Sequence, residues 1–326
     1  MVKTPSPSPL PPGEGKGEGT GIPFSEDQRG IEMDFLSELD RHKLIVGDGA
    51  MGSRLMACGL PAGTPGELWN LDRPDVVEAI QREYVEAGAQ FLLTNTFGGN
   101  ALTLALHGLE GRLEEINQAA VRIARSAAGG KAAVLGDIGP TGQLLEPIGT
   151  LSREEAREAF AAQARALASA GVDAMIAETF DSSEELGIAL GAALDVCELP
   201  LVASMKFQHE KTGRYRTMTG EGPEQLVAAA RGLGCAVIGT NCGQGIATMV
   251  GLVAEIAKLT DLPIIAQPNA GLPQLVKGQT VYRETPSVFA ASIPELYRAG
   301  ARIIGGCCGT TAGHVAAIRA FADQVA

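Results

Sequence analysis

Two adjacent cysteines, Cys307 and Cys308, follow an apolar run near the end of the chain, and a third, Cys242, follows a similar run. Neighbouring side chains diverge along an extended backbone, so a disulfide between the two adjacent thiols is not expected. Three thiols at the ends of two strands can bind one zinc ion and leave its fourth tetrahedral position open to an exchangeable ligand. The pattern therefore predicts a metal site formed by these three cysteines.

Such a site suits the activation of a thiol. Three thiolates around a divalent ion leave a net charge of about −1, which makes the ion a poor activator of water but keeps a bound substrate thiolate nucleophilic. A free thiol has a pKa of about 8.5 and is mostly protonated at neutral pH. The alternative is that the cysteines are small buried hydrophobic residues, but their matched positions favour a metal site. The other cysteines and the histidines are not expected to bind the ion: Cys58, Cys197, Cys235, His42, His107, His209 and His314.

The composition of the 326-residue chain is that of a globular protein, with 45% hydrophobic and 20% charged residues. No apolar stretch reaches the roughly 20 residues that a membrane-spanning helix needs, and no apolar signal peptide is present. The net charge of −12 and the lack of a basic cluster argue against nucleic acid as a partner. We expect a cytoplasmic protein with no membrane partner, in a compartment that keeps its six cysteines reduced.

The first 32 residues differ from the rest of the chain. Residues 5–12 are rich in serine, proline and leucine, and residues 13–21 alternate glycine with mostly charged residues. Such a segment cannot bury enough apolar area to offset the entropy that it would lose on ordering. We therefore predict a disordered, low-complexity tail at 1–32 and a single domain at 33–326.

Eight short, continuously apolar runs alternate with longer amphipathic segments after residue 43. This alternation is typical of parallel strands that are buried on both faces and joined by helices. The predicted strands are residues 44–48, 91–96, 133–138, 174–179, 201–207, 236–241, 263–267 and 302–306. Helical spacing with capping residues is clearest at 74–88, 152–171 and 182–197.

Eight such units predict a (β/α)8 barrel, the TIM barrel. A doubly wound sheet is the alternative, but it more often has a G-x-G-x-x-G motif after its first strand, whereas residues 47–52 read Gly-Asp-Gly-Ala-Met-Gly. Polar and thiol side chains gather at the carboxyl ends of the predicted strands, where barrel enzymes carry their active sites. These strand-end residues are Asp48, Thr94, Asn95, Asp137, Glu178, Lys206, Asn241, Cys242, Gln267, Asn269, Cys307 and Cys308. Their concentration at one end of the predicted barrel predicts an enzyme.

These strand-end motifs together resemble the homocysteine S-methyltransferase family, and most closely the homocysteine-binding barrels of its cobalamin-dependent members. The likeness extends from about residue 43 to the C-terminus, and its separated cysteine motifs are highly specific. The motifs are residues 48–52, 94–100, 136–142, 178–180, 240–243, 267–271 and 305–311. The resemblance implies a barrel that binds Zn²⁺ through the three cysteines and takes homocysteine as its substrate.

The resemblance also implies roles for individual residues in substrate binding. Asp48 and Glu178 would hold the amino group of homocysteine, and Thr94 would line the amino-acid pocket. Gly49 and Asp137 are further expected substrate-binding residues, although Asp137 could instead orient the loop that closes the pocket. An acid such as Glu178 at the end of an apolar strand must in any case find a cation or bear a desolvation cost.

Asn269 resembles the family asparagine that can occupy the fourth position of the zinc before substrate arrives. A short amide side chain on the strand between the two cysteine-bearing strands is physically suited to that role.

The methyl donor is the less defined half of the expected reaction. Members of the family use methylcobalamin, betaine, S-methylmethionine or S-adenosylmethionine. Betaine is disfavoured because recognition of its quaternary ammonium group needs an aromatic cage, and the chain has only Trp69 and four tyrosines to offer. Where the betaine-dependent members carry a tyrosine just after their T-N-T-F motif, this sequence has Gly98. We expect methylcobalamin carried by a separate corrinoid protein.

Two alternatives to this expectation stay open. One is a self-sufficient enzyme that uses S-methylmethionine or S-adenosylmethionine. The other is a partner subunit that binds zinc or homocysteine without turnover, although the complete set of pocket residues argues against it.

Overall fold

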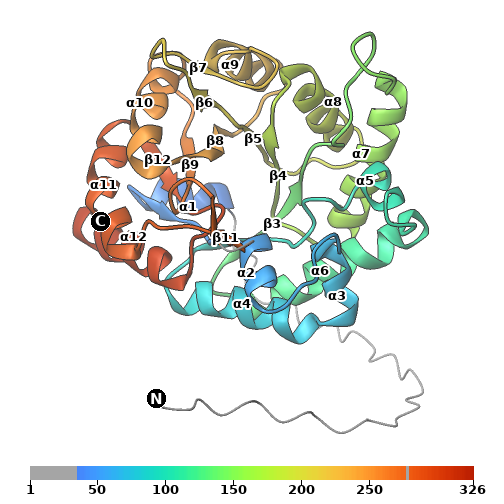
Figure 1. The fold of residues 1–326 in the computed structure, drawn as a ribbon, viewed down its shortest axis with the longest axis horizontal. Coiled ribbons are helices and arrows are strands. Elements are labelled where there is room, and N and C mark those ends of the chain that lie inside the picture. Colours follow the sequence, from blue (N-terminus) through green and yellow to red (C-terminus); the bar gives the residue numbers. More distant parts are fainter. Residues whose placement is uncertain (1–34, 277–278) are drawn as a thin grey trace, which may run out of the picture. The chain divides into compact units, whose positions relative to one another are not determined.

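The structure is a computed structural model that describes residues 35–276 and 279–326. Eight parallel strands form a nearly closed barrel in the order β1-β12-β9-β8-β5-β4-β3-β2, which confirms the predicted (β/α)8 architecture (Figure 1). The predicted tail, residues 1–32, lies outside the described residues, and the domain limits stay a prediction. The strands are β1 (Ile45–Val46), β2 (Phe91–Leu93), β3 (Ala133–Ile138), β4 (Ala174–Phe180), β5 (Leu201–Met205), β8 (Val237–Gly245), β9 (Ile264–Asn269) and β12 (Ala301–Ile304).

Helices surround the barrel and follow its strands (Figure 1). Serine side chains start two of them as the sequence predicts, since Ser152 accepts the N–H of Glu155 and Ser182 accepts the N–H of Glu185. The longer helices are α4 (Pro74–Glu86), α6 (Leu113–Ala128), α7 (Arg153–Ser169), α8 (Ser183–Leu194), α9 (Pro223–Gly232), α10 (Ile246–Ala257), α11 (Pro286–Arg298) and α12 (Ala312–Val325). None of the helices in the described ranges is long and apolar enough to cross a membrane.

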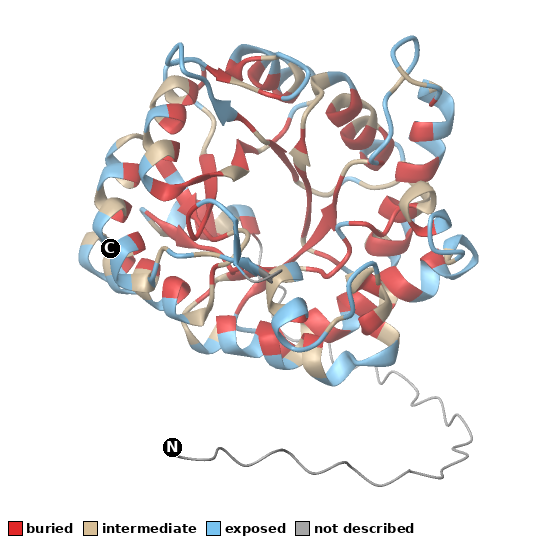
Figure 2. Ribbon diagram, viewed as in Figure 1, coloured by how far each residue is buried: buried red, intermediate tan, exposed pale blue. Residues whose placement is uncertain are grey.

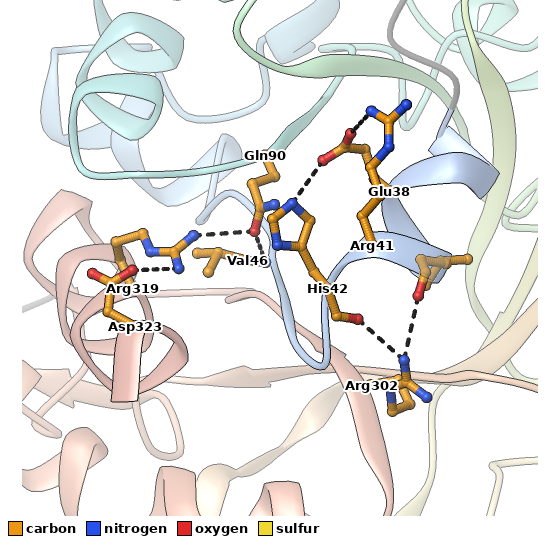
Figure 3. Close-up of polar contacts among 9 residues, drawn as sticks. Glu38, Arg41, His42, Val46, Gln90, Arg302, Arg319 and Asp323 are labelled. Atoms are coloured by element: carbon orange, nitrogen blue, oxygen red, sulfur yellow. Dashed lines mark hydrogen bonds and ion pairs between the residues drawn. The ribbon is translucent and has the colours of Figure 1, made fainter. Parts of the chain in front are cut away.

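The seam between β1 and β2 is closed largely by side chains, because β1 has only two residues. Gln90 donates its backbone N–H to the carbonyl oxygen of Val46 at 2.7 Å, and its side-chain oxygen accepts the N–H of Val46 at 3.0 Å. Arg319 of α12 donates to the same side-chain oxygen at 3.3 Å (Figure 3). Asp48 accepts the N–H of Leu93 through Oδ2 at 2.8 Å, so one of the predicted site residues also helps to close the barrel.

The amino-terminal end of the barrel is filled by apolar side chains. Phe35 and Leu39 of α1 (Phe35–Arg41) pack in one buried cluster with the first residues of the strands, and the rings of Phe35 and Phe91 meet edge to face at 5.9 Å. Arg302 fastens the end of this helix through hydrogen bonds to the carbonyl oxygens of Leu39 and His42 (Figure 3). Among the described residues, this packing fills the amino-terminal end and leaves the opposite end of the barrel for a ligand.

A second and larger core lies between the strands and the surrounding helices. Figure 2 shows buried residues along the strands and on the inner sides of the helices. The strands are buried on both faces, which is why each reads as a continuous apolar run in the sequence.

Two short hairpins beyond the carboxyl ends of the barrel strands depart from the prediction. One is β6 (Gln208–His209) with β7 (Tyr215–Arg216), and the other is β10 (Gln274–Val276) with β11 (Gln279–Val281). Strand β8 also runs four residues further than predicted, because a bulge around Cys242 lets it pair again with β9 at Gly245.

Candidate metal centre and substrate pocket

Three thiols meet at the carboxyl ends of the barrel. Cys242 lies within β8, Cys307 and Cys308 follow β12, and β9 lies between these two strands. The three sulfur atoms lie within 4.8 Å of one another. Sulfur ligands of a tetrahedral zinc ion, each about 2.3 Å from the metal, are about 3.8 Å apart, so a small adjustment fits these atoms to zinc. The three predicted ligands are thus brought together, and no histidine joins them among the described residues.

The backbone at the end of β9 holds the thiol-bearing segments. Cys307 donates its N–H to the carbonyl oxygen of Pro268 at 2.9 Å, and the carbonyl oxygen of Cys308 accepts the N–H of Ala270 at 2.9 Å. Cys242 adopts a left-handed conformation, with φ of 56°, inside the bulge of β8. Such a conformation is uncommon for a residue with a side chain, and bulges re-aim side chains next to functional sites.

The three thiols share their protons unequally. Hydrogen bonds from Cys307 and Cys308 lower the pKa of the Cys242 thiol to about 2. The same contacts raise the pKa of Cys307 well above its usual range and that of Cys308 to about 11. The protein alone therefore stabilises one thiolate at the expense of the other two thiols. A bound cation is needed to make all three ionised at neutral pH.

An amide side chain links the thiol cluster to the acid on β4. Thr179 has a left-handed backbone, with φ of 66°, which is rare for a β-branched residue. Asn241 holds it by accepting the Thr179 N–H at 2.9 Å and donating to the Thr179 hydroxyl at 2.6 Å. Because Thr179 follows Glu178 and Asn241 precedes Cys242, this pair sets the acid and the thiol relative to one another. The sequence predicts the place of Asn241 at a strand end but not this role.

The three carboxyl groups that the sequence predicts for substrate binding are buried and face the same space as the thiols. Burial raises the pKa of Asp48 to about 8. Burial, together with the nearby charges of Asp48 and Cys242, raises the pKa of Glu178 to about 8. The pKa of Asp137 is raised well above its usual range, first by burial and then by the neighbouring acids. All three groups are therefore poised to ionise when a cation comes close.

These carboxyl groups retain capacity to accept hydrogen bonds from a ligand. One oxygen each of Asp48 and Asp137 is buried and has no hydrogen-bond partner in the structure. Glu178, which is 8% exposed, makes no hydrogen bond through its carboxyl group to any described residue. Buried acceptors of this kind are expected to find a donor when the site is filled.

A cavity of about 410 Å³ joins the acids to the thiols. Its described lining has no lysine, arginine or histidine. Lys206 instead pairs with Asp181 at 2.8 Å, outside this lining. The lining includes Asp48, Gly49, Thr94, Asp137, Glu178, Cys242, Cys307 and Cys308. All the predicted substrate and metal residues except Asn269 therefore border one space that lacks a cationic side chain.

Thr94 and Gly49 shape the wall of this cavity. The Thr94 hydroxyl accepts the N–H of Asp137 at 3.0 Å and lies 2.6 Å from the hydroxyl of Thr96. Thr94 thus positions Asp137 as well as lining the space. A Cβ atom at Gly49 would lie 2.8 Å from the ring of Tyr84, so the chain can pass this close to the ring only with glycine.

Two further side chains complete the surroundings. Asn269 is 3% exposed, its side-chain oxygen has no hydrogen-bond partner in the structure, and its amide contributes to the lowered pKa of Cys242. Glu67 was not predicted; it lines the cavity and accepts the N–H of Gly98 at 2.6 Å. No strand-end position marks Glu67, because it lies in a short helix, η2 (Gly66–Leu68), that folds over the cavity.

The raised pKa of Glu178 predicts how stability depends on pH. Between about pH 4.5 and 8 the carboxyl group keeps its proton in the folded protein and loses it in the unfolded chain. The unfolded state then binds fewer protons, so the free energy of unfolding falls as the pH rises. In metal-free, substrate-free protein, Glu178→Gln should make this slope shallower by at most about 1.4 kcal/mol per pH unit.

Denaturant unfolding at a series of pH values measures this slope. Glu198→Gln, which changes an exposed carboxylate outside the pocket, serves as the control and should leave it unchanged. Equal slopes for wild type and Glu178→Gln would contradict the raised pKa.

Comparison with known proteins identifies the family. The family model described as homocysteine S-methyltransferase matches residues 45–322. Methionine synthase of Mycobacterium tuberculosis is 32% identical over 317 residues, which cover 92% of this chain and 26% of that protein. Methionine synthase of Mycobacterium leprae is 32% identical over 310 residues, which cover 90% of this chain and 25% of that protein. The chain thus spans about a quarter of the length of these curated relatives.

Solved structures support the same fold. The metallated form of the homocysteine methyltransferase MmuM from Escherichia coli superposes with a TM-score of 0.72 and 24% sequence identity, over 87% of this chain and 98% of that chain. The predicted enzyme class is confirmed by the family match, which extends over most of the chain. The chain belongs to the homocysteine S-methyltransferase family.

Proposed function

We propose that this protein transfers a methyl group to the sulfur of homocysteine to form methionine, with a zinc ion held by Cys242, Cys307 and Cys308. The observation that carries the proposal is the single cavity that these thiols share with Asp48 and Glu178. A thiol-binding end and an ammonium-binding end in one space match the two ends of homocysteine.

The thiol cluster suits zinc better than a harder cation, because thiolates are soft ligands and three of them leave a fourth tetrahedral position. Zinc, when bound, would supply positive charge that lowers the pKa of a neighbouring substrate thiol. Asn269, with its unpartnered buried oxygen, is suited to the exchangeable fourth position before substrate arrives. Reduced thiols are required throughout, which supports a cytoplasmic location.

The carboxyl groups would bind the amino group of the substrate. Asp48 and Glu178 lack a cationic partner in the lining of the cavity, so an incoming ammonium would ionise them and form charge-assisted hydrogen bonds. Thr94 would hold Asp137 in place beside them, through the hydrogen bond from the Asp137 N–H. Gly49 would let the chain pass close to Tyr84 and keep the pocket wall compact.

We propose methylcobalamin on a separate corrinoid protein as the methyl donor. The identity to two proteins named methionine synthase supports methionine as the product, and the resemblance of the strand-end motifs to the cobalamin-dependent members of the family favours this donor over the alternatives. Exposed apolar side chains on segments that follow the barrel strands offer a surface for a protein partner. They include Met56, Phe97, Leu144, Ile148, Met218 and Leu272.

Removal of one thiol tests the metal site. Cys307→Ala should abolish zinc retention during dialysis, because two thiolates cannot replace the three-sulfur site. Metal content is measured by elemental mass spectrometry. Cys235→Ala, which removes a buried thiol outside the cluster, should keep one zinc per chain. Full zinc occupancy in Cys307→Ala would reject the ligand assignment.

Removal of one acid tests the amino-group site. Glu178→Gln should lower kcat/KM for homocysteine by about 30-fold or more, the equivalent of about 2 kcal/mol for a lost buried charge partner. The loss should fall mainly on KM, with the zinc content unchanged. Steady-state kinetics with Glu198→Gln as the matched control measure the effect. An unchanged KM for homocysteine would exclude Glu178 from substrate binding.

A donor panel tests the reaction itself. The zinc-loaded protein is given homocysteine and, in turn, methylcobalamin alone, a methylated corrinoid protein, S-methylmethionine, S-adenosylmethionine and betaine, and methionine is quantified by mass spectrometry. We expect turnover with the corrinoid protein and none with betaine. Turnover only with a sulfonium donor would replace the proposed donor, and no turnover with any donor would favour a binding subunit.

A further inference from the structure

Gln267, on β9, is a buried side chain that the proposed function leaves without a role. It is 2% exposed and lines the cavity. Its side-chain oxygen is buried and has no hydrogen-bond partner in the structure. Asn95 carries the other amide in the described lining, and its Nδ2 donates to the carbonyl oxygen of Gly66 and to Oδ1 of Asn70, both at 2.9 Å. A buried acceptor without a donor costs free energy, so the Gln267 oxygen is expected to meet one when the cavity is filled.

The strand ends beside Gln267 bring it close to Asp48. Strand β12 lies between β9 and β1, and Gly305 follows β12 directly. Gly305 donates its N–H to Ala266 on one side at 3.1 Å, and Gly306 donates its N–H to Asp48 on the other at 2.8 Å, in both cases to the carbonyl oxygen. A Cβ atom at Gly305 would lie 3.3 Å from Cγ of Gln267 and 3.1 Å from the carbonyl oxygen of Asp48. Gln267 and Asp48 therefore flank one glycine, which puts no side chain between them.

Gln267 also points into the barrel at the level of the acids. Ile265 and Ile176 belong to the apolar cluster that fills the amino-terminal end of the barrel. Side chains alternate along a strand, so the residue two positions further, Gln267 on β9 or Glu178 on β4, points inward as well. Both side chains line the cavity. Gln267 and Glu178 therefore lie one layer above the apolar floor, in the stacked arrangement of barrel interiors.

The Gln267 oxygen suits the remaining N–H of a substrate ammonium. A primary ammonium group has three N–H donors, and all of them need acceptors once the group leaves water. In the proposed function, Asp48 and Glu178 accept two of these donors. A single ammonium offsets a single negative charge, so a neutral acceptor for the third N–H avoids burying further charge. Asp137 also has an unpartnered oxygen, but it would add another acid beside Asp48 and Glu178, whereas the Gln267 amide is uncharged.

We propose that Gln267 is a further substrate-binding residue, whose side-chain oxygen accepts one N–H of the substrate ammonium beside Asp48 and Glu178. The inference rests on the proposed function and deepens it. With three acceptors around the nitrogen, the pocket selects a primary ammonium, because each N-methyl group would remove a donor and leave a buried acceptor unsatisfied. Gln267 contacts the amino end of the substrate, so zinc binding does not depend on it.

Removal of the amide tests this contact through binding rather than turnover. Gln267→Met keeps the length of the side chain and removes the acceptor. In the zinc-loaded protein, the Kd for homocysteine, measured by isothermal titration calorimetry, should rise about tenfold or more, because a buried hydrogen bond to a charged donor is lost. The zinc content should stay unchanged. Gln324→Met, which alters an exposed side chain on α12, should match the wild type.

Two further comparisons identify the atoms involved. Decarboxylated homocysteine, an aminopropanethiol, keeps the thiol and the amino group, so Gln267→Met should weaken its binding by the same factor. Gln267→Glu keeps an acceptor oxygen but, once ionised, has no donor. It should therefore retain most of the affinity that Gln267→Met loses, whereas a contact between the amide N–H and the substrate carboxylate would be lost in both variants.

The outcomes separate the two proposals. A zinc-loaded wild type that does not bind homocysteine would overturn the proposed function and the role of Gln267 together. An unchanged Kd for homocysteine in Gln267→Met would overturn only the role of Gln267. So would a loss of affinity that is absent with the aminopropanethiol, since it would assign the amide to the substrate carboxylate. If Gln267→Met does not fold, homocysteine binding by Gln267→Glu as weak as that expected for Gln267→Met overturns the inference.

Discussion

The site depends on acidic groups that the protein itself does not neutralise. Three thiols and four carboxyl groups, those of Asp48, Glu67, Asp137 and Glu178, line one cavity, and its described lining has no cationic side chain. Burial and mutual repulsion keep most of these groups protonated in the protein alone. Under the proposed function, a metal at the thiols and an ammonium group at the carboxyl groups would supply the positive charge that ionises them.

The rest of the fold serves to hold these groups close in spite of their repulsion. Apolar packing at the amino-terminal end of the barrel, with α1 against the first residues of the strands, leaves the other end for the site. There, hydrogen bonds replace regular pairing: Asp48 bridges β1 to β2, and Asn241 bridges β8 to β4. Thr179 and Cys242, the two non-glycine residues with a left-handed backbone in the described part of the chain, lie at these irregular strand ends. Local strain is thus found where acid and thiol side chains are aimed at one space.

The barrel and most of the site could be predicted from the sequence, because parallel strands buried on both faces are continuous apolar runs and barrel sites lie at strand ends. The three thiols follow this rule. Glu67 does not, since it lies in a short helix, and its place depends on how that helix folds over the cavity. The role of Asn241 depends on the left-handed backbone of Thr179, and no local spacing encodes that conformation.

The lack of a cationic side chain in the lining also has a consequence for selectivity. A simple alkyl thiol could reach the sulfur cluster, but it would bring no positive charge to Asp48 and Glu178. Those carboxyl groups would then stay protonated in a space that keeps acceptor oxygens without donors. A site built to contact a polar group discriminates strongly against an analogue that lacks it, because its own buried groups are left unsatisfied. Under the proposed function, the lack of a cation in the lining would thus let the pocket select an amino-acid thiol over a simple alkyl thiol.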